Sequence, residues 1–306
     1  MSKKLFTVLR YAMLFLAVFL LGALLLRADV KFLWQVLHTA SVPWVFLSLL
    51  CIFYNFACAA KRYQILVAPK MDYAKIMEVI MAGFLLNYAS MVQGIGIGAK
   101  VGLMKARQVP VSRSMAGIAS EIGVDLLFTG CVGLVYILTI DTKFMPAVNS
   151  VSSIIALLGI ALLLIATTVV MNSRWSIFNS IYEELGMIVS SGRLHWVMLS
   201  TAGIWCSAGA GYYCLIVAAN SGDQVSGLLA FAAICIGFIT GLLSMVPGGL
   251  GVRELTWSYV VSSDGFLIEL AGLLAVIYRL LSIVLIICTL SLSRLFVEKD
   301  SIDADN

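Results

Sequence analysis

The chain has 306 residues, of which 61% are hydrophobic and only 12% are charged, and its mean hydropathy is +1.03. This balance excludes a soluble globular domain. It predicts a single integral membrane domain over 1–306, all-α and polytopic, with halves at about 1–145 and 146–306. The net charge of +4 is explained by basic loops, because no basic cluster with interleaved aromatic residues lies outside the apolar runs. We therefore expect no nucleic-acid partner.

Cysteine and histidine do not form a pattern that suggests metal or redox chemistry. The seven cysteines all fall inside apolar runs and make no Cys-x-x-Cys pair. The two histidines, His38 and His195, lie far apart at the edges of such runs. Small buried apolar residues are the simplest interpretation of the cysteines. We expect no metal site and no cofactor.

Apolar runs of the length needed to cross a bilayer recur along the chain. The first follows Lys3, Lys4 and Arg10 and lacks a clear cleavage site, so we expect a span there and not a removed signal peptide. The runs predict helices at 6–26, 42–60, 76–92, 114–140, 151–171, 195–219, 225–246 and 266–291.

Lysine and arginine set the predicted topology, because cytoplasmic loops carry an excess of both. If every apolar run crossed, Lys105, Arg107 and Arg113 would lie outside the cell. They move to the cytoplasm if 76–104 enters and leaves on the same side. The same treatment makes 225–262 a hairpin that enters from the outer side. About six full crossings then remain, with both termini in the cytoplasm and the chain in a bacterial or archaeal cytoplasmic membrane.

The predicted order of elements is the same in both halves: two crossings, a re-entrant hairpin and a further crossing. The two hairpins enter from opposite sides, which is the inverted-repeat plan of many transporters with broken helices. Each hairpin has a glycine-rich break with a cation beside it, at Gln93–Lys100 and at Pro247–Glu254. Proline and glycine make continuous helix costly there, and irregular backbone at membrane depth requires burial by protein or access to water.

Several charged residues remain at membrane depth, where each costs about 2.5–3.5 kcal/mol to insert. Glu121 and Asp125 are four residues apart and share one helix face. We expect both to contact a cation from another helix, either Arg253 or Arg279. Ion pairs that fasten helices are the alternative to a ligand site. The remaining charged residues at this depth are Lys100 and Glu254.

Arg253 is the best candidate for a ligand contact. Its fixed positive charge lies at a glycine-rich break, where the helix that restarts leaves its first backbone N–H groups unpaired. Both features favour phosphate or another anion.

The stretch Pro247–Glu254 resembles the C-terminal signature of the lysylphosphatidylglycerol synthase transmembrane (flippase-like) family. Weaker points of resemblance are Lys61-Arg62-Tyr63, Asn87, and Glu121 with Asp125. The first break departs from the family pattern: Gln93 stands where the family has proline, Ala99 stands for an acid, and Lys100 or Lys105 must supply the cation.

The resemblance covers essentially the whole chain. It implies handling of lipids with polar headgroups, such as aminoacylated phospholipids or polyprenyl-linked sugars. Members that synthesise such lipids carry a separate soluble transferase domain, so we expect the translocation part alone here. The residues expected to contact the headgroup are Arg253, Glu254, Gly248, Gly249, Gly251, Lys100, Glu121, Asp125, Arg279 and Asn87.

A lipid flippase is the leading functional hypothesis, with a membrane lipid or lipid-linked sugar as its partner and no catalytic residue. Arg253 and Lys100 would receive the phosphate of the headgroup at the two breaks. Glu121 and Asp125 would hold these two cations when the site is empty, or bind an amine on the headgroup. One alternative is a membrane enzyme or accessory factor in glycolipid or polysaccharide synthesis, with Glu121 or Asp125 as acid or base. No loop is large enough to bind a soluble donor, so a transporter is favoured over an enzyme. A small-anion secondary transporter, a homo-oligomer and a complex with partner membrane enzymes stay open.

Overall fold

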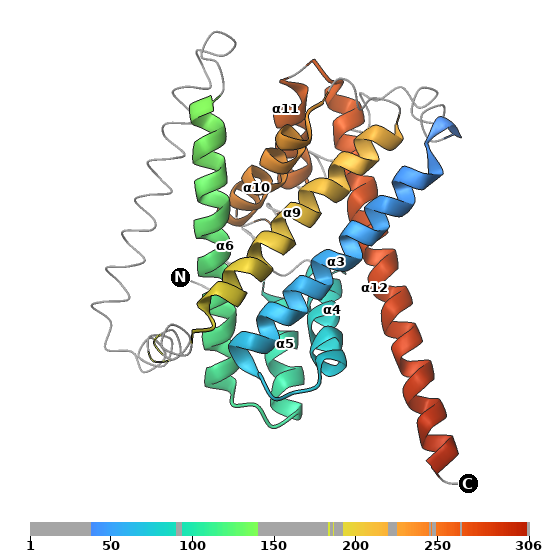
Figure 1. Ribbon diagram of the computed structural model, residues 1–306. Helices are drawn as coiled ribbons and strands as arrows, with labels where there is room; N and C mark the ends of the chain where they lie inside the picture. Colours follow the sequence, from blue (N-terminus) through green and yellow to red (C-terminus); the bar gives the residue numbers. More distant parts are fainter. Residues whose placement is uncertain are drawn as a thin grey trace, which may run out of the picture.

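The computed structural model describes residues 38–89, 94–139, 192–219, 225–244, 249–263 and 265–304, together with Glu183, Gly186 and Val246. This part of the chain is all α-helical, so the predicted fold class is confirmed. The predicted spans at 6–26 and 151–171 lie outside the described residues. The helices are α3 (Val42–Val67), α4 (Tyr73–Ala89), α5 (Ile95–Ala106), α6 (Val111–Thr139), α9 (Leu194–Ala218), α10 (Gly227–Leu243), α11 (Val252–Ser262) and α12 (Ile268–Ala304) (Figure 1).

Four of these helices, α3, α6, α9 and α12, are long and apolar enough to cross a membrane. α9 lies between the others and packs along α3 over most of its length (Figure 1). The two run antiparallel, because the amide of Ser41 at the start of α3 donates to the carbonyl of Ala218 at the end of α9, at 2.9 Å. α12 is also antiparallel to α9, since the Tyr212 hydroxyl donates to the carbonyl of Ala271 at 2.9 Å.

α4 and α5 form a hairpin that returns to its starting side. Short connections join it to the end of α3 and to the start of α6. Val67, Asp72, Ala106 and Pro110, which lie at these four helix ends, line one cavity. The arrangement agrees with the re-entrant hairpin that the positions of the basic residues predict.

α10 and α11 form a second hairpin at the opposite end of the bundle. α10 follows the end of α9, and α11 precedes the start of α12. Both of those ends lie on one side of the protein, as the contact between Tyr212 and Ala271 requires. In Figure 1 the α4–α5 hairpin occupies the lower half of the view and the α10–α11 hairpin the upper half. The two hairpins therefore enter the bundle from opposite ends.

Glycine lets the chain reverse at both hairpin tips. α5 begins after Gly94, which has φ of 92°, and α11 begins after Gly251, which has φ of 78°. The first helix restarts earlier than the sequence pattern predicts, so Lys100 lies in the second turn of α5 and not in the break itself. Arg253 lies in the first turn of α11. Pro247 and Gly248 lie outside the described residues.

Small residues on α9 allow its neighbours to approach closely. A Cβ added at Gly203 would lie 2.8 Å from the sulfur of Cys58 on α3. One added at Gly209 would lie 2.9 Å from Phe231 on α10. In lipid, where apolar burial drives association weakly, such close packing is what holds helices together.

Candidate functional site

Arg62 and Asp125 form a two-pronged ion pair deep between α3 and α6. Arg62 is only 4% exposed. Its Nη1 donates to Oδ1 of Asp125 at 2.6 Å, and its Nη2 donates to Oδ2 at 2.9 Å. Nη1 also donates to the hydroxyl of Thr201 on α9, at 3.0 Å. Parallel hydrogen bonds of this kind between guanidinium and carboxylate are among the strongest in proteins.

Glu121 lies one turn before Asp125 and binds a second cation. Its Oε2 lies 3.3 Å from Nζ of Lys100 on α5, and its Oε1 lies 3.7 Å from Nε of Arg62. The indole of Trp205 on α9 donates to Oδ1 of Asp125 at 2.8 Å. We call these four charged residues the buried charge cluster: Arg62, Lys100, Glu121 and Asp125. Two cations and two carboxylates balance within it.

The prediction that Glu121 and Asp125 contact Arg253 or Arg279 is therefore wrong. The structure places Arg62 and Lys100 there, and of these two only Lys100 is a cation that the sequence predicts the acids to hold. Arg62 was expected in a cytoplasmic loop, because the predicted helix ends at residue 60. α3 continues to Val67 instead and carries Arg62 inside the bundle. The apolar residues Ile65, Leu66 and Val67 after Arg62 were the available signal for a longer helix.

The tip of the second hairpin holds a separate ion pair. Glu254 is 4% exposed, and its Oε2 accepts from the amide of Gly251 at 2.8 Å, which caps the start of α11. Its Oε1 accepts from Nη1 of Arg279 on α12 at 2.7 Å. The guanidinium of Arg279 also lies over the ring of Tyr88 on α4, with Cζ 5.1 Å from the ring centroid. Arg279 thus touches both hairpins.

The stem of Arg253 runs between two glycines. A Cβ added at Gly249 would lie 2.5 Å from its Cδ, and one added at Gly241 on α10 would lie 2.6 Å from its Cγ. Gly249 also has φ of 66°, a conformation that side chains other than glycine rarely adopt. These glycines make the space that the arginine occupies.

Among the described residues, the guanidinium of Arg253 has an aromatic contact and forms no ion pair with a carboxylate. Its Cζ lies 5.5 Å from the ring of Trp257. Its Nε is fully buried and has no hydrogen-bond partner among the described residues. In the described part of the chain, the buried carboxylates are already paired with other cations. Glu121 and Asp125 pair within the buried charge cluster, and Glu254 pairs with Arg279. Arg253 is left as a cation without a carboxylate partner in that set.

The two hairpins repeat one packing device. In the second hairpin, Arg253 on the outgoing arm packs on Gly241 of the incoming arm. In the first, Lys100 on α5 packs on Gly83 of α4, where an added Cβ would lie 2.7 Å from Cγ of Lys100. The cations beside the two breaks therefore occupy corresponding places. Asn87 lies at the packing contact between α4 and α5. A Cβ added at Gly96 would lie 2.9 Å from the Cβ of Asn87.

The family model described as Lysylphosphatidylglycerol synthase TM region matches residues 8–289. The chain belongs to this family. No curated protein matches it.

Both hairpins and the ion pairs described above fall within the residues that match the lysylphosphatidylglycerol synthase TM region family. The resemblance inferred from Pro247–Glu254 is confirmed. Membrane location is likewise supported by the family and by the four long apolar helices. The placement of Arg62 in the buried charge cluster also gives a structural reason for the Lys61-Arg62-Tyr63 point of resemblance.

Proposed function

We propose that this protein binds a lipid with a phosphate-bearing headgroup and translocates it across the membrane, with Arg253 receiving the phosphate. Aminoacylated phospholipids and polyprenyl-linked sugars are the substrate classes that fit. The observation that carries the proposal is the guanidinium of Arg253, which is held at the second hairpin tip without a carboxylate partner among the described residues.

A cation in this position is favourable only when an anion joins it. Removing a charge from water costs several kcal/mol, and a ring contact offsets only about 0.5–2 kcal/mol of that. A phosphate can take two parallel hydrogen bonds from a guanidinium. Arg253 also lies in the first turn of α11, where helix amides and the helix dipole favour negative charge.

The surroundings favour a lipid over a soluble anion. Arg253 lies at the tip of a hairpin enclosed by helices long and apolar enough to span a bilayer. The two hairpins enter from opposite ends, an arrangement used for alternating access to a central site. A substrate whose acyl chains stay in the bilayer needs only its headgroup to pass these tips.

The pairing of the buried carboxylates supports a role in binding over a role in catalysis. A general acid or base must exchange a proton, and both Glu121 and Asp125 are already held by cations. Glu254 caps α11 and pairs with Arg279. We therefore favour transport over the alternative of a membrane enzyme that uses Glu121 or Asp125.

The test is lipid translocation in proteoliposomes. The vesicles contain fluorescent phosphatidylglycerol, and the measured quantity is the fraction of it that an added, impermeant quencher can reach. Wild type, Arg253→Lys and Arg253→Gln are compared. Loss of a charge-assisted hydrogen bond is worth about 1.5–3 kcal/mol, so Arg253→Gln should weaken headgroup binding roughly ten- to hundredfold. Arg253→Lys keeps the charge but loses the two-pronged geometry, and should be intermediate.

Lys61→Gln is the matched control, because Lys61 is exposed and its loss removes one positive charge outside the site. Its translocation rate should equal that of wild type. Uptake of radioactive inorganic phosphate by the same vesicles separates lipid transport from small-anion transport. A well-folded Arg253→Gln protein that moves lipid at the wild-type rate would contradict the proposal.

A further inference from the structure

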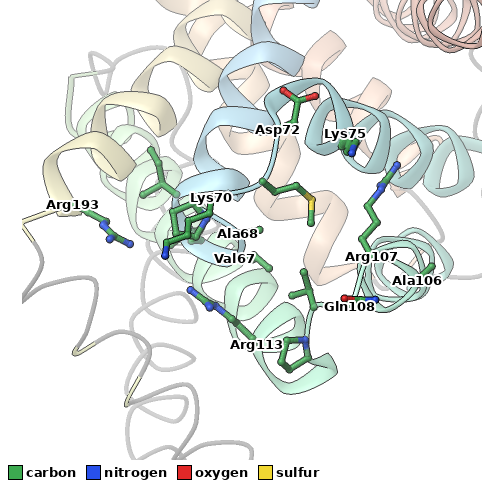
Figure 2. A pocket seen from close by; sticks show the side chains of 16 residues that line it. Val67, Ala68, Lys70, Asp72, Lys75, Ala106, Arg107, Gln108, Arg113 and Arg193 are labelled. Atoms are coloured by element: carbon green, nitrogen blue, oxygen red, sulfur yellow. The ribbon is translucent and has the colours of Figure 1, made fainter. Parts of the chain in front are cut away.

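A large cavity opens where three apolar helices begin or end. Its volume is about 1100 Å³, and it is lined from the end of α3, the connection to α4, the connection from α5 to α6, and the start of α9 (Figure 2). α3, α6 and α9 are three of the four helices fit to cross a membrane. Their common ends place the cavity at the level of the lipid headgroups. It is far in sequence from the Arg253 site and shares no lining residue with it.

The cavity is lined by many cations and few acids. Figure 2 shows basic side chains from five different segments around the open space. Asp72 is the one acidic residue among those that line it. Such a concentration of one sign of charge in a concave site attracts anions. We call this cavity the basic pocket, and its cations are Lys70, Lys75, Arg107, Arg113 and Arg193.

Arg107 supplies a donor that is already desolvated. Its Nη2 lies 2.7 Å from Oε2 of Glu78, which orients the guanidinium. Its Nη1 is buried and has no hydrogen-bond partner in the described part of the chain. An unsatisfied buried donor on a charged group is costly, and an anion in the pocket would satisfy it.

Helix ends add to the positive potential. α4, α6 and α9 all begin at the pocket, and the start of α9 has no side-chain cap. The amides of a helix N-terminus favour anions. α3 and α5 end there, and the basic residues of the pocket lie beside those ends, where cations offset the negative pole.

We propose that the basic pocket binds a phosphate group, carried on a lipid headgroup or free in solution. Leu66, Val67 and Val109 give it an apolar wall that suits the glycerol part of a lipid. Arg62 lies one helical turn before Leu66 on α3, so the buried charge cluster lies about one turn from the pocket lining along α3. The inference stands on the pocket alone and holds whether or not Arg253 receives a transported headgroup.

The experiment measures binding by the full-length protein purified in detergent. Phosphatidylglycerol, diacylglycerol with the same acyl chains, and inorganic phosphate are the probes, with native mass spectrometry for the lipids and the thermal unfolding midpoint for phosphate. One variant is Lys70→Gln/Lys75→Gln, which removes two exposed charges that form no ion pair with a described residue, and the other is Arg107→Gln. Lys105→Gln is the control, because Lys105 is exposed in the last turn of α5, two residues before Arg107, and does not line the pocket.

Each lost cation should weaken phosphatidylglycerol binding about fivefold, and the loss should shrink at high salt. Lys105→Gln should keep the binding that the pocket variants lose. Competition by inorganic phosphate means that the phosphate group alone is recognised, whereas binding of phosphatidylglycerol without competition means that the lipid is required. Saturable binding of inorganic phosphate alone identifies a free anion as the ligand.

The proposal is overturned if the folded pocket variants bind all probes as the wild type does, or if diacylglycerol binds as well as phosphatidylglycerol. Failure of the Arg253 hypothesis gives a different pattern. Arg253→Gln would then translocate lipid normally, while the pocket variants would still lose phosphate binding.

Discussion

In the first hairpin Lys100 lies 3.3 Å from Glu121, whereas in the second hairpin Arg253 lies over the ring of Trp257 and forms no ion pair with a carboxylate of the described residues. The two cations otherwise correspond, since each packs on a glycine of the other hairpin arm. The difference comes from the next helix along the chain. α6 brings an acid to the first tip, and α12 brings a second cation, Arg279, to the other.

This asymmetry separates a fastening role from a binding role. Where charges balance, as in the buried charge cluster, an ion pair fixes helices against one another. Where a cation is in excess, as at Arg253, we propose that the protein keeps an affinity for an anion. The same type of residue at corresponding places can thus serve two purposes, and the identity of the facing helix decides which.

Asp125→Asn should cause the largest loss of stability. It leaves Arg62, which is 4% exposed, without its two-pronged partner. Removing one member of a buried ion pair costs about 3–5 kcal/mol. The thermal unfolding of the purified protein in detergent measures this. Asp72→Asn makes the same chemical change at an exposed residue and should leave stability unchanged. An equal midpoint for both variants would contradict the assignment of a fastening role.

Gly241→Ala should have a smaller effect that falls on the second hairpin. The added methyl group would lie 2.6 Å from Cγ of Arg253, and overpacking of this kind costs about 1–3 kcal/mol. Because it displaces the arginine stem, translocation should fall more than stability. Gly98→Ala on α5 is the control, since nothing lies within 4 Å of its added Cβ. Equal translocation rates for Gly241→Ala and Gly98→Ala would show that the packing of Arg253 between the glycines does not matter for transport.

Arg253→Met should have the smallest effect on stability although it removes a large charged side chain. No hydrogen bond from the Arg253 side chain to a described residue is lost, and methionine fills a similar volume. Replacing a buried charge by an apolar residue is often neutral, so we expect a change within about 1 kcal/mol. Arg62→Met should destabilise far more. Thermal unfolding of the two variants side by side sharpens the comparison, and a severe loss in Arg253→Met would assign it a fastening role as well.

Much of the fold followed from local sequence. The span predicted at 114–140 is α6 at Val111–Thr139, because apolar length and composition act within one segment. The basic residues after 104 indicated the first hairpin, since a charge in a short loop reports the side of the membrane. The C-terminal helix extends beyond its predicted end at residue 291, to Ala304.

The partners of the charges could not be predicted in the same way. Spacing along a helix shows that Glu121 and Asp125 share a face, but not which helix that face meets. Lys61 and Arg62 look alike in sequence, yet the first is exposed and the second is buried. Neighbours on a helix point about 100° apart, so the packing of α3 on α6 and α9 decides between them. Trp205 gave no signal at all, because it lies inside an apolar run.

The position of Arg279 has a thermodynamic consequence. One side chain touches Tyr88 near the first hairpin tip and Glu254 at the second. If the two tips separate, Arg279 can keep only one of these contacts, so the free energy of one tip depends on the position of the other. By linkage, an anion that draws Arg279 or Glu254 aside at one tip changes the stability of the closed arrangement at both. In the proposed transport cycle, opening on one face of the membrane and closing on the other would be coupled through this one guanidinium.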